Sequence, residues 1–402
     1  MITSFFVALG LWFGASVTFA SEFAPSPVPL FDEDNAPYKY SGILESNVGL
    51  GSGSVAIHPQ LVLGCAHVNF DFPNSEWLSD IRWHWKWNGV GLPPGSGLLM
   101  DGQWNFDSYR KFVKSRYGLL DPRALNTDFV VNYSTANTAG GEYADWIERG
   151  DLYLAKKLPK LITGYPIGLY TNPVGLYANY TDPAAQYRMH ETGPFSTQFQ
   201  FVDSRKYPNL MGARGVIGGQ GNSGGPVWGV KDGQWAFAGV FTSIAFDTAN
   251  NPYIGVYALG KSSWDRISSA IGTVGALPGQ LSGNFLLSSV PAQTVDVGTV
   301  RRNFTVSGMV GFVDTMTLDL VIHHNRRSDL RVELTSPSGA TVMVCNLGNR
   351  TGTSAKNLVC TGKKILGFRG FHANGVWILS VKDAYPENRG TLVSASLALT
   401  TH

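Results

Sequence analysis

The sequence predicts an all-β protein with two consecutive β domains, and composition and strand pattern both favour this class. Charged residues make up 15% of the 402 residues, and glycine occurs 47 times. An average soluble domain is roughly 25% charged, so low charge with many glycines argues against coiled coils, long helices and disordered chains. Short apolar runs separated by Gly, Pro and Asn recur along the chain and are typical of strands joined by tight turns.

The net charge and the cysteine count exclude several classes of function. Thirty-one basic and 29 acidic residues leave a formal charge of +2. This balance removes the usual electrostatic argument for a nucleic-acid partner. Three cysteines are too few for a disulfide scaffold or a four-cysteine zinc site.

Residues 1–20 are predicted to be a signal peptide. An apolar run covers residues 3–20, and Thr18 and Ala20 occupy the −3 and −1 positions of a cleavage site. No Lys or Arg precedes the run, which leaves an uncleaved membrane anchor as the competing interpretation. The polar segment SEFAPSP follows without a basic cluster and argues against an anchor. We therefore expect a secreted protein, extracellular or periplasmic, with no membrane contact after signal removal.

The rest of the chain divides into a tether, two domains and a linker. Residues 21–39 are rich in proline and acid, which predicts a tether or a short propeptide. Residues 40–272 hold the first set of β-type runs and end in a helix in which Ser262 and Asp265 resemble a capping box and Gly272 is the expected stop. Residues 273–288 are predicted to be a linker, and 289–402 alternate apolar and polar residues as a β-sandwich does.

The strongest local signal for chemistry is the segment GGQGNSGGP, which contains Ser223. Glycines on both sides let the backbone turn sharply, expose the serine hydroxyl and aim N–H groups inward. A glycine-rich loop that contains a serine often has no catalytic role. A nucleophilic serine also requires a base and an orienting acid elsewhere in the chain. His67 follows the apolar run LVLG, and Asp128 directly precedes the apolar run FVV. An acid there is costly to bury unless it is paired, and a histidine N–H would pair it.

The sequence GNSGG also fits the nucleophile elbow of α/β-hydrolases. That fold requires a helix after the serine and a histidine downstream of it. The segment after Ser223 is strand-like, and the later histidines all lie in the second β domain. The order His67, Asp128, Ser223 therefore argues against the elbow.

Residues 40–271 resemble the bacterial-type branch of the trypsin/chymotrypsin-like serine proteases. The matching motifs are LGCAH around His67, NTDFVV at Asp128 and GNSGGP around Ser223, and PYIGVYALGKSSWDRISSAI is similar to the closing strand and helix of that fold. The resemblance implies a double β-barrel in which Ser223 is the nucleophile and His67 the general base, then acid. Asp128 would orient the imidazole. The backbone N–H groups of Gly221 and Ser223 would form the oxyanion hole.

Two positions depart from the pancreatic members of the family. Asn222 stands where those enzymes have Asp, so we do not expect activation by an ion pair with a newly cut N-terminus. No second cysteine follows His67 closely, so Cys65 is expected to be a small buried residue.

The substrate pocket is expected to include Ile217, Phe241, Thr242, Ser243 and Ile244. None of these residues carries a carboxylate, which disfavours cleavage after Arg or Lys. Phe241 stands where glutamyl endopeptidases place a histidine, which weakens the case for acidic substrates. We expect an apolar or small residue before the scissile bond.

Residues 289–402 resemble the P domain (P/Homo B) of proprotein convertases and some secreted bacterial proteases. The resemblance lies in DLVIHHNRRSDLRVELTSPSGA and FRGFHANGVWILSVKDAYPENRGTLVSASLAL, and Ala395 departs from it where the family commonly has Trp. It implies a jelly-roll β-sandwich. No catalytic constellation falls in this region, so we expect the domain to stabilise the protein or to position or recognise substrate.

The second domain also raises the question of a disulfide and of calcium. Cys345 and Cys360 flank a loop of 14 residues, and a bridge there would be worth about 3 kcal/mol. Two free buried thiols are the alternative. Four aspartates could bind calcium, as they do in some family members: Asp314, Asp319, Asp329 and Asp383. No EF-hand spacing supports this, so solvated turn acids are favoured, and we expect no other metal or cofactor.

We therefore predict a secreted, monomeric serine endopeptidase that acts on protein or peptide substrates. The rival from another class is a catalytically silent, protease-like binding protein or adhesin. The presence of all three triad residues argues against that rival.

Overall fold

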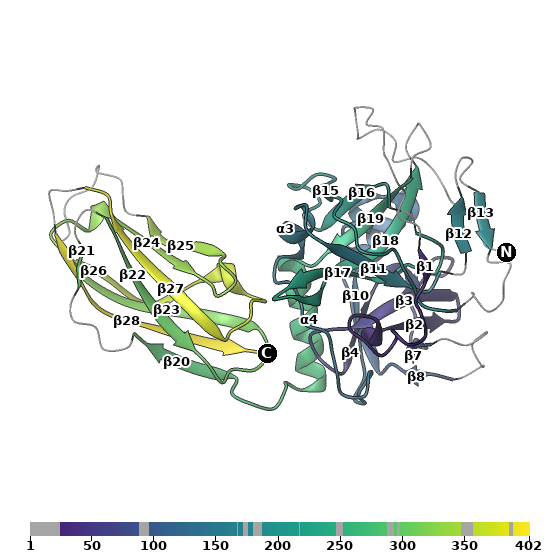
Figure 1. Ribbon diagram of the computed structural model, residues 1–402, viewed down its shortest axis with the longest axis horizontal. Coiled ribbons are helices and arrows are strands. Elements are labelled where there is room, and N and C mark those ends of the chain that lie inside the picture. Colours follow the sequence, from purple (N-terminus) through teal and green to yellow (C-terminus); the bar gives the residue numbers. More distant parts are fainter. Residues whose placement is uncertain are drawn as a thin grey trace. The chain divides into compact units, whose positions relative to one another are not determined.

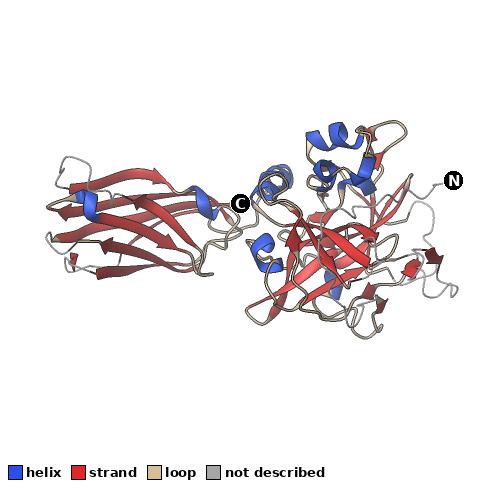
Figure 2. Cartoon of the chain, turned by 90° about the horizontal axis from the view of Figure 1, so that it is seen from above, coloured by secondary structure: helices blue, strands red, loops and turns tan. Residues whose placement is uncertain are grey.

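The computed structural model describes residues 25–87, 96–166, 168–171, 176–179, 187–216, 218–246, 252–287, 293–295, 298–346, 357–385 and 389–402. The chain divides between Val274 and Gly275 into two compact units, called here the first and the second unit. Strands dominate both units, as Figures 1 and 2 show, which confirms the predicted all-β class. The predicted signal peptide, residues 1–20, lies outside the described residues.

One sheet of the first unit carries the segments around His67 and Asp128. Among the described residues it is antiparallel with the order β8-β7-β2-β3-β4-β10-β9. The bounds are β2 Ser41–Ser46, β3 Gly49–Val55, β4 Leu61–Gly64, β7 Arg82–Trp85, β8 Leu98–Leu99, β9 Gly102–Trp104 and β10 Val130–Tyr133. Leu44, Val55, Val62 and Trp83 are buried together in its core.

A second sheet of the same unit carries the strand that follows Ser223. Its order is β1-β14-β11-β17-β18-β19-β16-β15 in the part of the chain that the structure describes. The bounds are β1 Ser26–Pro27, β11 Lys160–Gly164, β14 His190–Glu191, β15 Gln200–Phe201, β16 Leu210–Arg214, β17 Pro226–Lys231, β18 Gln234–Phe246 and β19 Pro252–Ala258. Two short pairs lie apart from both sheets: β5 (Phe70–Asp71) with β6 (Glu76–Trp77), and β12 (Gly168–Thr171) with β13 (Leu176–Asn179).

Short helices connect these strands, and one longer helix closes the unit. The short ones are α1 Asp107–Val113, α2 Pro122–Leu125, α3 Gly150–Leu154 and the 3-10 turns η1 Tyr38–Tyr40, η2 Ala66–Asn69 and η3 Gly118–Leu120. The closing helix α4, Lys261–Val274, buries Trp264, Ile267 and Ile271 on one face, as the spacing predicted.

Both predicted ends of α4 were slightly wrong. The helix already includes Ser262, whose hydroxyl accepts a hydrogen bond from the Asn209 side chain at 2.6 Å instead of capping the helix. It also continues past Gly272, because Gly275 is the residue with a left-handed φ of +97°, which ends helices.

The N-terminal segment predicted as a tether is packed against the first unit. Ser26 and Pro27 pair with β14, and the Val28 N–H donates to the Met189 carbonyl at 2.9 Å. Val28 is fully buried beside Ile43 and Tyr165. Proline is tolerated on an edge strand, which is why the proline-rich composition concealed this pairing.

The second unit is a sandwich of two antiparallel sheets. One sheet has the order β20-β28-β23-β26 with β21 also on β28, and the other has the order β22-β27-β24-β25 among the described residues. The bounds are β20 Ser282–Leu286, β21 Gln293–Val295, β22 Gly298–Val306, β23 Val313–His324, β24 Leu330–Thr335, β25 Thr341–Asn346, β26 Asn357–Lys364, β27 Gly375–Asp383 and β28 Gly390–Thr401; η4 Arg327–Asp329 and η5 Leu366–Phe368 are 3-10 turns. Successive strands mostly alternate between the sheets, as expected of a jelly roll.

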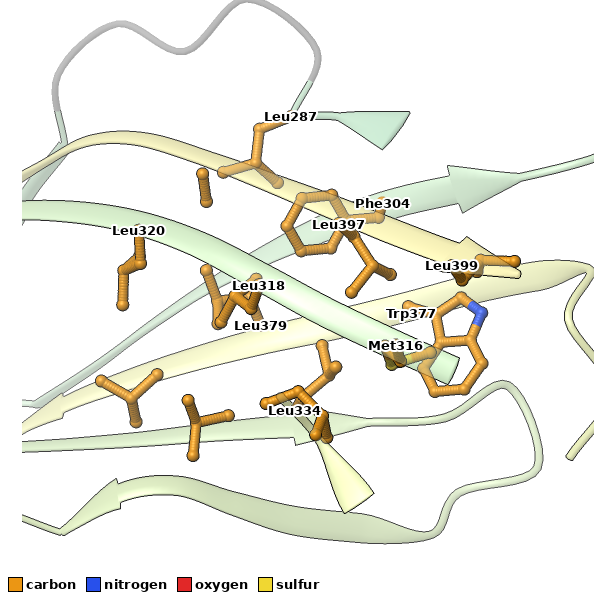
Figure 3. Close-up of a cluster of buried hydrophobic side chains, with 14 of the residues drawn as sticks. Leu287, Phe304, Met316, Leu318, Leu320, Leu334, Trp377, Leu379, Leu397 and Leu399 are labelled. Atoms are coloured by element: carbon orange, nitrogen blue, oxygen red, sulfur yellow. The ribbon is translucent and has the colours of Figure 1, made fainter. Parts of the chain in front are cut away.

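Alternating side chains fill the space between the two sheets of the second unit. Along β23 buried residues alternate with more exposed ones. Figure 3 shows Leu318 and Leu397, which are partners on neighbouring strands of one sheet, in the same buried cluster as Phe304 and Trp377 of the other sheet. The predicted β-sandwich is confirmed.

Part of the predicted linker, residues 273–288, belongs to this sandwich. Strand β20 pairs with β28 from Ser282 opposite Thr400 to Leu286 opposite Ser396. Phe285 packs against the core, but Leu286 is 71% exposed. Backbone hydrogen bonds rather than apolar burial hold this edge strand, which is why its composition resembles a linker.

Candidate active site

The first sheet brings His67 and Asp128 together. Strands β4 and β10 are antiparallel with Gly64 opposite Val130. His67 follows the end of β4 in η2, and Asp128 lies just before the start of β10, so both occupy the same edge of the sheet. The His67 ring Nδ1 lies 2.7 Å from Asp128 Oδ2, and the His67 backbone N–H donates to Asp128 Oδ1 at 2.9 Å. Both carboxylate oxygens therefore hold one histidine.

Burial and charge act in opposite directions on His67. The Asp128 side chain is 1% exposed and the His67 side chain 20% exposed. Burial lowers the pKa of His67, but the charge of Asp128 and its hydrogen bond outweigh burial, so the pKa lies above its usual range. With Nδ1 donating to the carboxylate, the lone pair at Nε2 is left to accept a proton.

The loop from Gly218 to Gly225 leads into β17 and exposes part of Ser223. It is tied to β18, because Gly224 N–H donates to the Phe241 carbonyl and Phe241 N–H to the Gly225 carbonyl, both at 2.8 Å. Gly224 has a φ of +86°, and a Cβ on it would lie 2.2 Å from the Ser52 carbonyl oxygen. Only glycine fits this position, as the glycine pattern predicted.

Contacts on both sides of His67 locate the serine loop beside it. A Cβ on Gly224 would lie 3.0 Å from the Cys65 backbone nitrogen. A Cβ on Gly51 would lie 2.4 Å from a Val68 methyl and 2.9 Å from the Ser223 carbonyl oxygen. Cys65 and Val68 lie just before and just after His67 in sequence, so the loop packs against the histidine segment.

The predicted pocket residues fall into two groups. Phe241 is 1% exposed, and a Cβ on Gly218 would lie 2.5 Å from its Cζ atom and 3.4 Å from Ile244 Cδ1. The hydroxyls of Ser243 and Thr242 lie instead beside Gly255 of β19, 2.2 and 3.3 Å from the position of a Cβ there. Phe241 and Ile244 are thus brought together next to the serine loop. Ile217 lies outside the described residues.

Cys65, His67 and Asp128 place potential metal-ligand atoms within 4.8 Å of one another, but their chemistry does not suit a metal. The Cys65 thiol is buried and donates to the Phe241 carbonyl at 3.1 Å. Burial and then the charge of Asp128 raise the pKa of Cys65 well above its usual value. Metal binding requires a thiolate, which burial and the charge of Asp128 disfavour at Cys65.

In the second unit, other protein groups contact most of the aspartates considered for calcium. Asp314 accepts from Arg369 Nε at 3.1 Å, and Asp319 accepts from the Gly362 N–H at 2.6 Å. Asp383 lies 3.0 Å from His324 Nε2, with both side chains fully buried. Asp329 is fully buried as well. The favoured interpretation, solvated turn acids, is therefore wrong for Asp329 and Asp383, and calcium binding stays the alternative prediction.

The two predicted disulfide partners are close but not bonded. Cys345 on β25 and Cys360 on β26 have their sulfur atoms 3.8 Å apart, so both are thiols in this structure. The disulfide stays a prediction.

Ser52 of β3, which was not among the predicted site residues, contacts the serine loop directly. Its N–H donates to the Ser223 carbonyl and its hydroxyl to the Gly221 carbonyl, each at 2.7 Å. The signal that could have found it is the run GLGSGS before His67, since small residues allow two backbones to approach closely.

The arrangement of the first unit matches the features from which its fold was predicted. The His–Asp pair lies at the end of one antiparallel sheet, the serine loop precedes a strand of the other, and a helix closes the unit. The arrangement of two antiparallel sheets and a closing helix agrees with the all-β architecture predicted for this unit.

Comparison with known families identifies part of the second unit. Residues 313–399 match the model of the proprotein convertase P-domain. The match confirms the predicted resemblance of this region to the P domain.

Comparison with curated proteins and solved structures finds enzymes. Leupeptin-inactivating enzyme 1 of Streptomyces exfoliatus is 38% identical over 172 residues, which are 42% of this chain and 36% of that protein. The chain thus spans about a third of that relative's length. The structure of a Glu endopeptidase in complex with MPD aligns with 63% of this chain and with 98% of the endopeptidase chain, with a TM-score of 0.43 and 15% sequence identity. Protease Anisep from Arthrobacter nicotinovorans covers 60% and 96%, with a TM-score of 0.38 and 13% identity.

Among the described residues, no helix is both long enough and apolar enough to cross a membrane.

Proposed function

We propose that this protein is a serine endopeptidase whose first unit performs the chemistry. The observation that carries the proposal is the buried His67–Asp128 pair, in which both carboxylate oxygens hold the histidine beside a glycine-rich serine loop. An ordinary surface salt bridge leaves its acid in contact with water. The Asp128 side chain is instead 1% exposed, and both of its oxygens accept hydrogen bonds.

In the proposed reaction Ser223 Oγ attacks the carbonyl carbon of the scissile peptide bond, and His67 Nε2 takes the hydroxyl proton. The tetrahedral intermediate collapses when His67 gives that proton to the leaving amine, which leaves an acyl ester on Ser223. Water then attacks the ester, with His67 again as base, and releases the acid and free serine. Asp128 holds the imidazole and stabilises its cationic form throughout.

The backbone N–H groups of Gly221 and Ser223 would stabilise the oxyanion of each tetrahedral intermediate. Removing one such donor typically lowers kcat by roughly 10²- to 10³-fold. The tight turns of the loop support this role, because they fix the N–H directions before substrate arrives.

We propose a preference for a small or apolar residue before the scissile bond. The buried Phe241 ring and Ile244 lie against Gly218, where the pocket wall is expected. Side chains of the protein itself thus occupy space that a large substrate side chain would need. A peptide-library cleavage profile tests this, and a profile dominated by Arg, Lys or Glu would contradict it.

We also propose export, with removal of residues 1–20, and a disulfide between Cys345 and Cys360 in the mature protein. The two thiols would lose two protons and two electrons to a disulfide-bearing oxidant of the exporting compartment, which becomes a dithiol. The 3.8 Å separation supports this, since a small side-chain rotation would bring the sulfurs to bonding distance. N-terminal sequencing and alkylation of the exported protein test both statements; a retained Met1 or two alkylated thiols would contradict them.

Labelling with a fluorophosphonate tests the proposed chemistry directly. The wild type and a Ser269→Ala control on α4 should label, and Ser223→Ala should not. Wild type that is correctly processed but does not label would favour a catalytically silent binding protein instead.

A further inference from the structure

Ser52 is a buried residue of β3 that makes three hydrogen bonds to other segments. It is fully buried. Its N–H donates to the Ser223 carbonyl at 2.7 Å, and its hydroxyl donates to the Gly221 carbonyl at 2.7 Å. The same hydroxyl accepts from the Tyr165 N–H at 2.8 Å. The Ser52 hydroxyl therefore donates one hydrogen bond and accepts one.

The two carbonyls that Ser52 holds belong to the two residues whose N–H groups would bind the oxyanion. The carbonyl of a residue belongs to the peptide plane that follows it, so Ser52 fixes the plane between residues 221 and 222 and the plane between residues 223 and 224. The Ser223 N–H lies in the plane between these two, and the Gly221 N–H lies in the plane just before them. Glycine at position 221 offers no side chain that could hold these planes. One residue of the first sheet thus restrains both oxyanion donors on the serine loop.

The third bond connects Ser52 to the rest of the unit. Tyr165 follows β11 of the second sheet and is buried with Val28, Ile43 and Met189. The Tyr165 N–H can only donate and the Gly221 carbonyl can only accept, so the Ser52 hydroxyl accepts from Tyr165 and directs its hydrogen to Gly221. Position 222 is Asn, so no carboxylate is available there to pair with a cut N-terminus and order the loop.

We propose that Ser52 is a positioning residue that orders the oxyanion hole of this enzyme in place of such an ion pair. The inference rests on the proposed serine endopeptidase function. Ser52 does not touch substrate; it acts through the peptide groups of Gly221 and Ser223.

The chain offers a matched control on the same strand. Ser54 is also fully buried on β3, but its hydroxyl has no hydrogen-bond partner among the described residues. Ser52→Ala and Ser54→Ala therefore remove the same hydroxyl oxygen from the same strand. Only Ser52→Ala removes the hydrogen bond to the Gly221 carbonyl.

The experiment measures kcat and KM on a tri-alanine p-nitroanilide, with active sites counted by fluorophosphonate labelling. We expect Ser52→Ala to lower kcat roughly 10-fold, less than the loss of a whole oxyanion donor, with KM within about twofold of wild type. A tri-alanine trifluoromethyl ketone, which forms a tetrahedral adduct, should bind Ser52→Ala more weakly by the same factor. Ser54→Ala should match wild type, and Ser52→Thr, which keeps the hydroxyl, should restore most of kcat.

Counting labelled sites separates loss of folded enzyme from loss of rate per site. The role of Ser52 is overturned if the wild type labels and turns over but Ser52→Ala has the kcat and ketone affinity of Ser54→Ala. It is also overturned if KM alone changes. A wild type that does not label overturns the proposed function itself.

Discussion

His67 presents two donors to Asp128, one from its backbone and one from its ring, and this sets both its orientation and its charge. The backbone bond fixes the start of η2 relative to β10. The ring bond fixes which nitrogen carries the proton. A single carboxylate therefore decides the geometry and the proton affinity of the proposed base.

The pH dependence of kcat/KM should report the raised pKa of His67. The base must be neutral to take the serine proton, so activity should rise with pH through this pKa. Burial lowers the pKa, but the charge and hydrogen bond of Asp128 raise it further, so the midpoint of the acid limb should lie above the usual value of about 6.5. Asp128→Asn should shift the midpoint down and lower kcat by roughly 10⁴-fold. If the midpoint of the acid limb is the same in Asp128→Asn as in the wild type, the group that titrates there is not His67.

Phe241 should control how large a residue the enzyme accepts before the scissile bond. Phe241→Ala removes the ring next to Gly218, so the cleavage profile should shift from small and medium-sized residues toward large apolar ones such as Phe and Trp. The ring is 1% exposed, so the change should also lower the free energy of unfolding by about 3–5 kcal/mol. Profiling with the peptide library below the lowered Tm measures the first effect. An unchanged profile would mean that Phe241 is a core residue without a role in specificity.

At the scale of elements, β14 carries a buried histidine between β1 and β11. His190 is 1% exposed, and its Nδ1 lies 2.9 Å from the Arg188 carbonyl oxygen. Burial is the main reason that its pKa is lowered to about 4, with the charge of Arg188 acting in the same direction. The strand that anchors the N-terminal segment thus contains a group that resists protonation.

The stability of the first unit should therefore fall in mild acid. Below about pH 6.5 the unfolded chain protonates His190 while the folded chain does not until about pH 4, so unfolding gains protons and stability falls with falling pH. The loss across this window should be about 3 kcal/mol. Urea unfolding at pH 7.5, 5.5 and 4.5 measures it. His190→Leu should flatten the dependence, and His323→Gln, at an exposed position, should not. Equal slopes in all three proteins would contradict this.

Elements with a strong apolar pattern were predictable from the sequence, and elements held by backbone pairing were not. LVLG, FVV and the alternation of β23 gave correct strands because their side chains are buried. Strands β1 and β20 were predicted as a tether and a linker, since they lie at sheet edges and bury little. The pairing of His67 with Asp128 followed from motif order. Ser52 did not, because its role depends on long-range hydrogen bonds that leave no local pattern.

At the scale of the whole molecule, each unit has its own apolar core. The largest buried side chains of the first unit include Trp228 and Trp264. The ring centroids of Trp264 and Trp146 are 6.2 Å apart. In the second unit Trp377 is fully buried with Phe368 at 4.9 Å, edge to face. The division between Val274 and Gly275 separates these two cores. Two units that each have a core of their own are expected to unfold in separate transitions.

Calorimetry of the full chain should therefore show two transitions that respond to different mutations. Trp377→Ala leaves a large cavity in the sandwich and should lower the free energy of unfolding of that unit by about 3–5 kcal/mol. It should leave the other transition in place, and peptide hydrolysis below the lowered Tm should be unchanged. Trp264→Ala is the matched change in the first unit and should lower the other transition together with the temperature at which hydrolysis is lost. If either substitution moves both transitions equally, the two cores unfold as one cooperative unit, which would contradict the expectation of two separate transitions.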